Sequence, residues 1–469
     1  MSSFPYLVEP TSVPPLDPGF RPAVLANRAF VQAVEASGTG VTLVLGLERG
    51  DGSISRYETQ VFAEGTPEAE ANLFYAERLA KFLLWQRGAY KIYVGGPASI
   101  GVHLEAAYQA GGLRAFDAEF MGDSVYAKTF EIVSCAAEEV PAARETTAPL
   151  GRHLDGCRIG FDLGASDRKV SAVIDGEAVY SEEVVWEPRK NTDPQYHVDE
   201  VKAALKTAAS KMPRVDAIGG SSAGVYVNNR PMIASLFRGI SQDDYHVVRD
   251  MFINIGKEMG VPLDIVNDGD VTALAGAMSL EEDGVLGIAL GSSEAVGYVN
   301  PDGNITGWLN ELAFAPVDYN SEAACCEWSM DFGVGALYFS QQCVFHLASR
   351  AGIDLPEGEG VTDAQRLKHV QGFLEDGHEG ATNIWHSMGI YLGYSLAHYA
   401  DFYDINHVLI LGRCTSGSGG DLILNGATDL LKREFPALAE KINVQLPDEK
   451  SRRVGQSIAA ASLPQLNQQ

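Results

Sequence analysis

Two segments of the sequence place a carboxylate directly after an apolar run that is typical of a buried strand. The first run ends at Asp162, which is followed by Gly164 and then by the polar groups of Ser166 and Lys169. An Asp at a strand end beside a glycine turn can hold a hydrated Mg²⁺, and the backbone N–H groups of such a turn can approach phosphates. The same residues also suit an ordinary Asp-Gly β-turn, so both interpretations stay open.

The second carboxylate is Asp268, in the segment VNDGDVTAL that follows another apolar run. In α/β proteins, ligands bind at the carboxyl ends of the strands. Asp268, beside the side-chain amide of Asn267, could therefore accept a proton from a substrate hydroxyl. Asn and Asp are also common caps of a following helix, which is the alternative interpretation of this segment.

Two further segments combine glycines with hydroxyl groups. GIALGSSEAVGY predicts two strands joined by a tight turn at Gly291 and Ser292. Gly412 ends the apolar run HVLILG, and a loop containing Gly417 then precedes a predicted helix. Glycine lets the backbone approach a ligand closely, and the N-terminus of a helix attracts anions, so both segments could contact a nucleotide.

The elements around these segments change character along the chain. Residues 1–150 begin with a proline-rich arm. A hairpin at Gly50-Asp51-Gly52, a helix from Pro67 to Gly88 and further strands follow, which predicts an α+β unit. From residue 156 onward, predicted strands alternate with predicted helices, which indicates α/β units on a sheet. Two hairpins, one in each half of this region, suggest two related lobes.

In their order, these segments resemble the phosphate 1, connecting, phosphate 2 and adenosine motifs of the sugar kinase, heat-shock chaperone and actin superfamily. More narrowly, the chain resembles the ROK family of bacterial sugar kinases and repressors over about two thirds of its length. IGFDLGASDRKVSAVIDG is similar to the family's opening strand pair, GSSAGV to its sugar-cleft segment, VNDGDVTALAGAM to its Asn-Asp motif and VLILGRCTSGSGGDLIL to its adenosine segment.

The resemblance implies an α/β fold, a two-lobed actin-like ATPase (ribonuclease H-like) core with an additional N-terminal α+β domain. The implied boundaries are 1–150 for that domain, whose role is unknown, 156–270 for the first lobe and 271–451 for the second. A C-terminal helix, 452–469, is expected to return to the first lobe.

The resemblance also implies roles for single residues. Asp268 is the expected catalytic base, Asp162 the expected Mg ligand, and Asn267, Glu311 and Gly224 the expected sugar contacts. The residues expected to contact the nucleotide are Asp162, Gly164, Ser166, Lys169, Gly291, Ser292, Gly412 and Gly417. ATP and Mg are the expected cofactors.

The chain departs from the family pattern at several of these sites. The His-and-three-Cys zinc motif is missing, because Cys325, Cys326 and Cys343 lack its spacing, so we expect no structural zinc. Phe314 stands where the sugar segment has His. Near the phosphate 2 turn, Ser293, Ala295 and Val296 replace glycines, and Arg413 and Cys414 replace glycines after Gly412. Each side chain limits how closely the backbone can approach a phosphate.

Composition excludes some classes of partner. The net charge of −27, from 62 acidic and 35 basic residues, should repel nucleic acid and anionic lipid. Six scattered cysteines without a CxxC pair, and the lack of a signal peptide or a membrane-spanning apolar run, favour a cytoplasmic protein. A small-molecule sugar is the expected partner, and we expect a homo-oligomer, a dimer, without nucleic acid or membrane.

Two functions are therefore compatible with the sequence. The first is an ATP-dependent sugar kinase, in which Asp268 deprotonates a sugar hydroxyl and Mg²⁺ near Asp162 offsets the charge of the transferred group. The second is a sugar- or metabolite-binding regulator that keeps the fold without productive ATP binding. The altered phosphate 2 turn favours the regulator, and the retained Asp162 and Asp268 favour the kinase.

Overall fold

The structure is a computed structural model that describes residues 4–145, 151–164, 166–358, 360–447 and 449–466. Its first lobe is a five-stranded sheet in the order β11-β8-β5-β6-β7. The antiparallel hairpin of β5 and β6 opens the lobe, and β8 and β11 then add in parallel on the other side of β5. The elements are β5 (Cys157–Leu163), β6 (Asp167–Ile174), β7 (Glu177–Val185), α5 (Pro194–Ala209), β8 (Ala217–Ser222), β9 (Val225–Val227), β10 (Arg230–Ile233), α6 (Tyr245–Arg249), α7 (Met251–Met259) and β11 (Leu263–Asn267).

The second lobe repeats this plan with a four-stranded sheet in the order β13-β12-β14-β15. The antiparallel hairpin of β12 and β13 is again extended by parallel strands, here β14 and β15. The elements are β12 (Val285–Leu290), β13 (Glu294–Val299), α9 (Gln341–Ala348), α10 (Asp363–Glu375), α11 (Glu379–Tyr399), β14 (His407–Leu411), α12 (Gly419–Glu434), α13 (Pro436–Lys441) and β15 (Asn443–Gln445).

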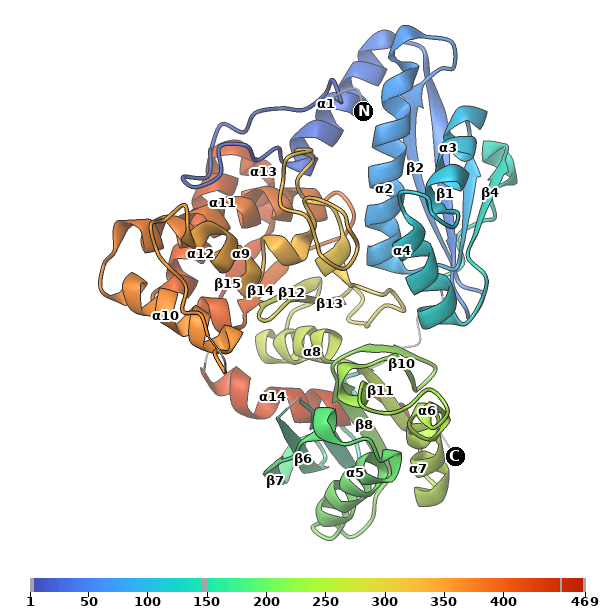
Figure 1. Cartoon of the computed structure of the whole chain (residues 1–469). Coiled ribbons are helices and arrows are strands. Elements are labelled where there is room, and N and C mark those ends of the chain that lie inside the picture. The colour runs from blue at the N-terminus through green and yellow to red at the C-terminus, as the bar shows by residue number, and fades with distance from the viewer. Residues whose placement is uncertain (1–3, 146–150, 165, 359, 448, 467–469) are drawn as a thin grey trace.

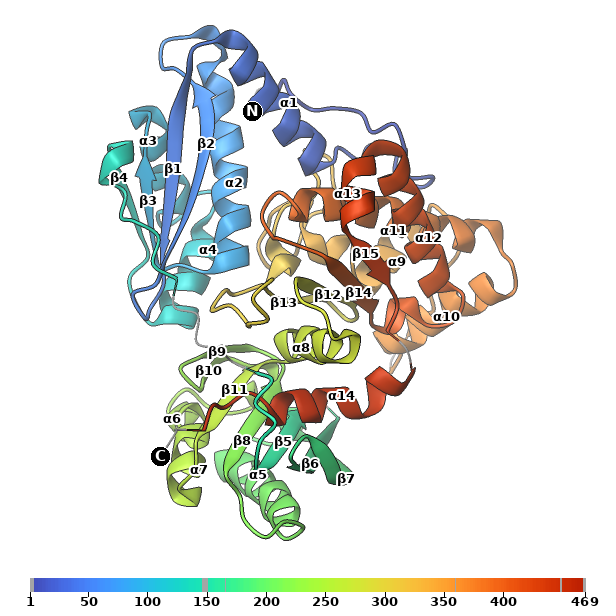
Figure 2. The same cartoon turned by 180° about the vertical axis from the view of Figure 1, so that it is seen from behind.

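Two helices, α8 (Asp268–Leu280) and α14 (Glu449–Ala461), lie against each other between the two sheets (Figures 1 and 2). Glycines let α14 approach the first sheet. A Cβ added to Gly160 would lie 1.8 Å from the carbonyl oxygen of Ser457, and one added to Gly219 would lie 1.6 Å from that of Ala460. Larger residues on β5 and β8 would therefore push this helix away. The two sheets and the two helices form a two-lobed actin-like ATPase core.

The N-terminal part is a separate four-stranded sheet in the order β2-β1-β3-β4, with helix α2 on the side that faces the second lobe (Figure 1). β1 pairs antiparallel with β2 and β3, and β4 adds in parallel to β3. The elements are α1 (Ala23–Ser37), β1 (Gly40–Glu48), β2 (Ile54–Phe62), α2 (Ala71–Arg87), β3 (Lys91–Gly95), α3 (Ala98–Tyr108), α4 (Ala115–Glu119), the π-helical segment η2 (Phe120–Tyr126) and β4 (Glu131–Cys135).

The N-terminal part shares one continuous apolar core with the second lobe. The proline-rich arm crosses the second lobe, where the ring of Phe20 packs edge-on against Tyr391 at 4.8 Å and the hydroxyl of Tyr391 donates to Asp17 at 2.9 Å. The first lobe has a core of its own around Phe161 and Phe252. The N-terminal part therefore packs as an extension of the second lobe.

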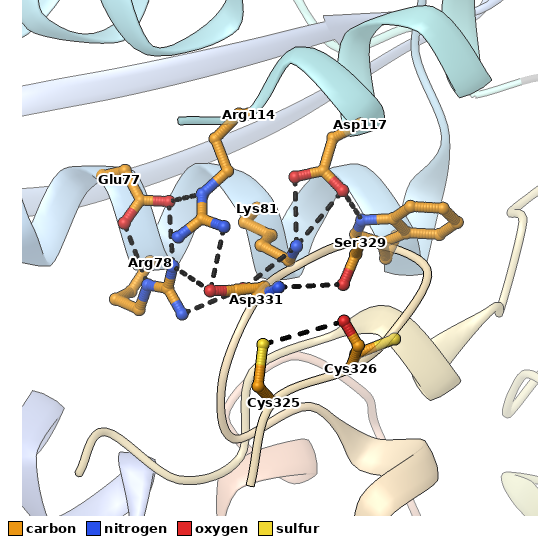
Figure 3. Close-up of polar contacts among 10 residues, drawn as sticks. Glu77, Arg78, Lys81, Arg114, Asp117, Cys325, Cys326, Ser329 and Asp331 are labelled. Atoms are coloured by element: carbon orange, nitrogen blue, oxygen red, sulfur yellow. Dashed lines mark hydrogen bonds and ion pairs between the residues drawn. The ribbon is translucent and has the colours of Figure 1, made fainter. Parts of the chain in front are cut away.

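A buried cluster of six charges also joins the N-terminal part to the second lobe (Figure 3). Asp331 of the second lobe contacts Arg78 at 3.1 Å, Lys81 at 3.0 Å and Arg114 at 2.9 Å, and every one of these side chains is at most 2% exposed. Two further anions complete the cluster, Glu77 beside Arg78 and Arg114, and Asp117 beside Lys81. Three positive and three negative groups thus balance one another away from water. We call these six residues the ion cluster.

Most of the expected strands and helices are present, with small differences at their ends. The side-chain hydroxyl of Thr66 does not cap the following helix but donates to the carbonyl oxygen of Ala63, because a turn of 3₁₀-helix (Pro67–Glu70) precedes α2. The helix that follows Asn267 begins at Asp268. Across the described residues, none of the helices is both long enough and apolar enough to cross a lipid bilayer.

Candidate active site

The two candidate carboxylates lie at the same edge of the first sheet. β5, β8 and β11 run in parallel, and Asp162 on β5 is level with Ser221 on β8 and, through it, with Val266 on β11. Neighbouring strands are about 4.8 Å apart, so Asp162 and the end of β11 are separated by about 10 Å. Asp268 follows the end of β11 and starts α8. The fold therefore brings Asp162 and Asp268 to one site from positions 106 residues apart in the sequence.

Burial perturbs both carboxyl groups, and the charge of Asp162 also acts on Asp268. Burial raises the pKa of Asp162, whose Oδ1 accepts a hydrogen bond of 2.7 Å from the hydroxyl of Ser221. Burial, and then the negative charge of Asp162, raise the pKa of Asp268 to about 6. A carboxyl group with a pKa near the working pH can exist as a base while remaining able to release a captured proton.

Asn267 and Gly224 are held together, but both polar atoms of the Asn267 side chain have protein partners. Its Oδ1 accepts from the backbone N–H of Gly269 at 2.7 Å, which caps α8, and its Nδ2 donates to the carbonyl oxygen of Gly224 at 2.8 Å. Gly224 has a φ of 132°, and a Cβ there would lie 2.4 Å from the carbonyl oxygen of Ile233. The helix-cap interpretation of Asn267 is therefore correct, and a sugar contact by this residue stays a proposal.

Glu311 reaches the same site from the second lobe. Burial, and then the charge of Asp268, raise the pKa of Glu311 to about 7. The C-terminal end of α2 holds its backbone in place, because the N–H of Glu311 donates to the carbonyl oxygen of Trp85 at 3.0 Å and the N–H of Asn310 donates to that of Gln86 at 2.8 Å. The N-terminal part thus positions one of the predicted substrate contacts.

Phe314, at the family's His position, packs against aromatic residues of the N-terminal part. Its ring centroid lies 4.4 Å from that of Trp85 and 5.7 Å from that of Phe116. An imidazole at this position would find an apolar environment instead of a sugar hydroxyl. The departure from the family pattern is therefore explained by the docking of α2 and α4.

Sequence reasoning missed two buried acids beside the site, Asp270 and Glu294. Burial raises the pKa of Asp270 to about 7 and that of Glu294 to about 8. Asn310 donates to Asp270 at 3.2 Å, whereas Glu294 receives only a 3.3 Å hydrogen bond from Tyr399, and its Oε2 has no partner among the described residues. A charged residue at the first position of an otherwise apolar strand, as in EAVGYV, was the available signal for Glu294.

The turn between β5 and β6 carries two of the predicted nucleotide contacts, Gly164 and Ser166, and a third, Lys169, follows on β6. The N–H of Gly164 donates to the carbonyl oxygen of Asp167 at 2.9 Å, and the hydroxyl of Ser166 donates to the carboxylate of Asp167 at 3.0 Å. Lys169 lies 3.6 Å from Asp167. Asp162 and Lys169 also line a cavity of about 280 Å³, so a small polar ligand could contact both side chains.

The turn between β12 and β13 is narrow and exposed. Gly291 accepts at its carbonyl oxygen from the N–H of Gln341 at 2.9 Å, and its own N–H donates to Ser293. The side chains of Ser292 and Ser293 are exposed at the tip. The hydroxyl of Ser292 is therefore accessible to a ligand, whereas the N–H of Gly291 has a partner within the turn, and the nucleotide contacts expected of both residues stay predictions.

The adenosine segment has its backbone tightly constrained. Gly412 has a φ of 103°, and a Cβ there would lie 2.5 Å from the carbonyl oxygen of Leu290, so no larger residue fits. Gly417 has a φ of 64°. The carboxylate of Glu375 accepts from the backbone N–H of Ser418 at 2.9 Å and from its hydroxyl at 3.0 Å. An acidic side chain therefore takes up a donor at the start of α12, where a nucleotide contact was expected.

A metal ion could be held by protein side chains alone or could arrive together with a nucleotide. In the described parts of the chain, no three His, Cys, Asp or Glu side chains converge in a way that could hold a metal ion. Asp162 and Asp268 nevertheless fit a Mg²⁺ that a nucleotide brings with it, because such an ion keeps several waters and uses one or two carboxylates. The repulsion that raises the pKa of Asp268 would then be offset by the cation.

No family model and no curated protein matches this sequence. Among solved structures, a ROK family transcriptional regulator that is a homologue of the E. coli MLC protein matches with a TM-score of 0.52 and 16% identity, over 70% of this chain and 81% of its own. A ROK hexokinase from Thermus thermophilus matches with a TM-score of 0.50 and 15% identity, over 65% of this chain and 97% of its own.

A ROK family glucokinase from Streptomyces griseus matches with a TM-score of 0.47 and 19% identity, over 65% of this chain and 98% of its own. The regulator and the hexokinase, both at low identity, establish the fold. The chain therefore has the two-lobed, actin-like ATPase fold of the ROK proteins, with an additional N-terminal α+β part.

Proposed function

We propose that this protein transfers a phosphoryl group from ATP to a hydroxyl group of a sugar. The observation that carries the proposal is the carboxyl group of Asp268, which starts α8 beside Asp162 and has a pKa of about 6. A general base of that pKa, placed at the carboxyl ends of parallel strands, suits the removal of a proton from an alcohol at neutral pH.

The residues around Asp268 have separate tasks in this proposal. Asp268 accepts the proton of the reacting hydroxyl, and its position is fixed because Asn267 caps α8. Glu311 and Asp270, whose pKa values are both about 7, can each donate or accept a hydrogen bond from a neighbouring hydroxyl. Asp162 lies on β5 at the same edge of the sheet, where a Mg²⁺ would supply the charge that offsets the phosphates. Catalysis would then rest on positioning and electrostatics.

A second candidate, a sugar-binding regulator without phosphoryl transfer, is favoured by two specific features. Glu294 places a buried acid directly after the phosphate 2 turn, and Glu375 takes up the backbone N–H of Ser418. The negative charge of Glu375, and that of Glu294 once it is ionised, disfavours a triphosphate at these places. The kinase proposal requires that Mg²⁺ offsets this repulsion and that Glu375, which is exposed, moves away.

The experiment that tests the proposal measures ADP release with Mg-ATP and a panel of neutral sugars. The wild-type protein should release ADP only when its sugar is present. Asp268→Asn should fold normally and lose roughly 10²–10⁴-fold in kcat, which is typical of a missing general base. Asp199→Asn, an exposed residue of α5, is the matched control and should keep the wild-type rate. Full activity in a folded Asp268→Asn variant would refute the assignment of the base.

A further inference from the structure

A cavity of about 470 Å³ begins next to the candidate base and is lined by all three parts of the molecule. The first lobe contributes Gly224 and Asn267, which precedes Asp268, together with the β9–β10 hairpin. Helix α8, between the two sheets, contributes Asp270, and the second lobe contributes the segment 305–309. The N-terminal part contributes the third wall, with the turn that follows β1 and the end of η2. The cavity is therefore continuous with the candidate site but extends beyond the two lobes.

The third wall is built firmly into the fold. η2 is a π-helical segment that packs against β9 and β10 of the first lobe, and its last residue, Tyr126, fits between two glycines. A Cβ added to Gly50 would lie 2.9 Å from the ring of Tyr126, and one added to Gly88 would lie 2.2 Å from its hydroxyl. Such irregular helical segments frequently occur at functional sites. The position of Tyr126 on the cavity wall is thus fixed by its surroundings.

The charges that line the cavity disfavour an anionic ligand. Asp51, Asp264 and Asp270 line it, and Arg49 is the single Lys or Arg residue among its lining residues. The guanidinium group of Arg49 is already paired with Glu145 at 2.5 Å. With this excess of carboxyl groups, a sugar phosphate or a sugar acid would be repelled, whereas a neutral sugar would not.

The cavity also offers an unused polar group. Thr306 is 9% exposed and lines the cavity, and its Oγ1 has no hydrogen-bond partner among the described residues. A buried hydroxyl without a partner is unfavourable unless a ligand or water satisfies it. The side chains of Tyr126, Tyr226 and Trp308 line the same cavity, so flat apolar surfaces accompany the polar groups, as is usual in ligand sites.

We propose that the substrate is a neutral sugar of disaccharide size, and that the N-terminal part recognises the unit that does not react. This inference rests on the kinase proposal for Asp268 and adds the class of the acceptor. The volume of 470 Å³ lies within the roughly 300–1,000 Å³ of small-molecule sites and exceeds what one sugar ring fills. Thr306 donates to or accepts from a hydroxyl of the second unit, and Val227 on β9 contacts its ring face.

The test compares the affinity for neutral disaccharides with that for their component monosaccharides by isothermal titration of the full chain. The panel contains glucose, galactose and N-acetylglucosamine beside maltose, cellobiose, lactose and diacetylchitobiose. The variant Thr306→Val removes a polar contact, and the variant Val227→Trp narrows the cavity. The matched controls are Thr207→Val, at a half-buried position of α5 that does not line the cavity, and Val102→Trp, on the exposed face of α3.

The wild-type protein should bind one disaccharide at least about tenfold more tightly than its monosaccharides, a preference of the size that a few added contacts give. Thr306→Val should lower the affinity for that disaccharide by roughly five- to tenfold, as expected for one lost hydrogen bond. Val227→Trp should remove the preference for the disaccharide over its monosaccharides while changing the affinity for the monosaccharides by no more than about twofold. Both control variants should behave as wild type.

Three results would overturn the inference in distinguishable ways. If a monosaccharide binds as tightly as every disaccharide, and Val227→Trp changes nothing, the proposal about the cavity is wrong while the kinase proposal stands. If a sugar phosphate or sugar acid binds more tightly than the neutral sugars, the assignment of a neutral ligand is wrong. If no sugar of either size binds, the kinase proposal fails together with this inference.

Discussion

Replacing Asp331 by asparagine should destabilise the protein strongly, because Asp331 is the negatively charged residue through which the second lobe takes part in the ion cluster. The substitution would leave three buried cations, Arg78, Lys81 and Arg114, beside only two buried anions. Burial alone would raise the pKa of Asp331, but Arg78 and Lys81 hold it below its ordinary value. The residue is therefore ionised at neutral pH and contributes its full charge to the cluster.

The expected size of the effect follows from burial. Removing one partner from a fully buried ion pair costs about 3–5 kcal/mol, since the remaining charge has no water to replace it. The matched control is Asp401→Asn, which breaks an ion pair of 2.8 Å between Asp401 and Arg28 whose side chains are 35% and 40% exposed. An exposed pair of this kind is worth about 0–1 kcal/mol.

Urea unfolding followed by tryptophan fluorescence measures both effects, since the indole of Trp85 donates to Asp117 within the cluster at 2.9 Å. The difference in the free energy of unfolding between the two variants should persist at high salt, because salt screens buried charges poorly. Because the native pKa of Asp331 is lowered, its contribution is present above pH of about 4 and is lost as the pH falls through its native pKa. If Asp331→Asn lowers the free energy of unfolding by no more than Asp401→Asn does, the reasoning is refuted.

Three further predictions concern the acids and the metals of the site. The kcat/KM of the kinase reaction should fall as the pH is lowered through about 6, because Asp268 becomes protonated, and a flat profile down to pH of about 5 would contradict its role as base. Glu294 keeps its proton up to a pH of about 8 in the native state but loses it near 4.5 when unfolded, so stability should decrease as the pH rises from about 5 to 8. In the wild-type protein this effect should lower the free energy of unfolding by roughly 3 kcal/mol between a pH of about 5 and 7, and Glu294→Gln should abolish it. Thermal melts of the wild type and of Glu294→Gln at several pH values measure the difference. Elemental analysis of chelator-washed protein should find no stoichiometric zinc, because Cys325, Cys326 and Cys343 lack the spacing of a closed tetrahedral site, and one bound zinc per chain would show that these thiols were misinterpreted.

Sequence patterns predicted the parts of this fold that depend on neighbouring residues. The Asp-Gly hairpin of β5 and β6, the strand that ends at Asn267 and the hairpin around Gly291 all follow from local alternation and turn residues. The meeting of Asp162 with Asp268 was predicted only through the family resemblance, although parallel strands place both at one sheet edge. The individual roles of these residues stay predictions.

The docking of the N-terminal part could not be predicted, because it depends on contacts between residues that are far apart in sequence. Trp85 packs on Phe314 and holds Glu311 through its carbonyl oxygen, and neither contact has a local signature. The same is true of Asp331, because a single Asp in the mixed sequence SMDFG gives no sign of burial. Glu294 was overlooked because a charge beside a turn is usually exposed.

Isothermal titration of Mg-ATP into the full chain, with and without a sugar that binds, tests the proposed phosphoryl transfer most directly. Asp162 and Asp268 are acidic groups in the region where the phosphates must bind, so nucleotide binding depends on the accompanying Mg²⁺. The kinase proposal predicts that Mg-ATP binds and that its affinity increases when the sugar is present. Sugar binding without detectable nucleotide binding, even at millimolar Mg-ATP, would contradict the kinase proposal and leave the regulator.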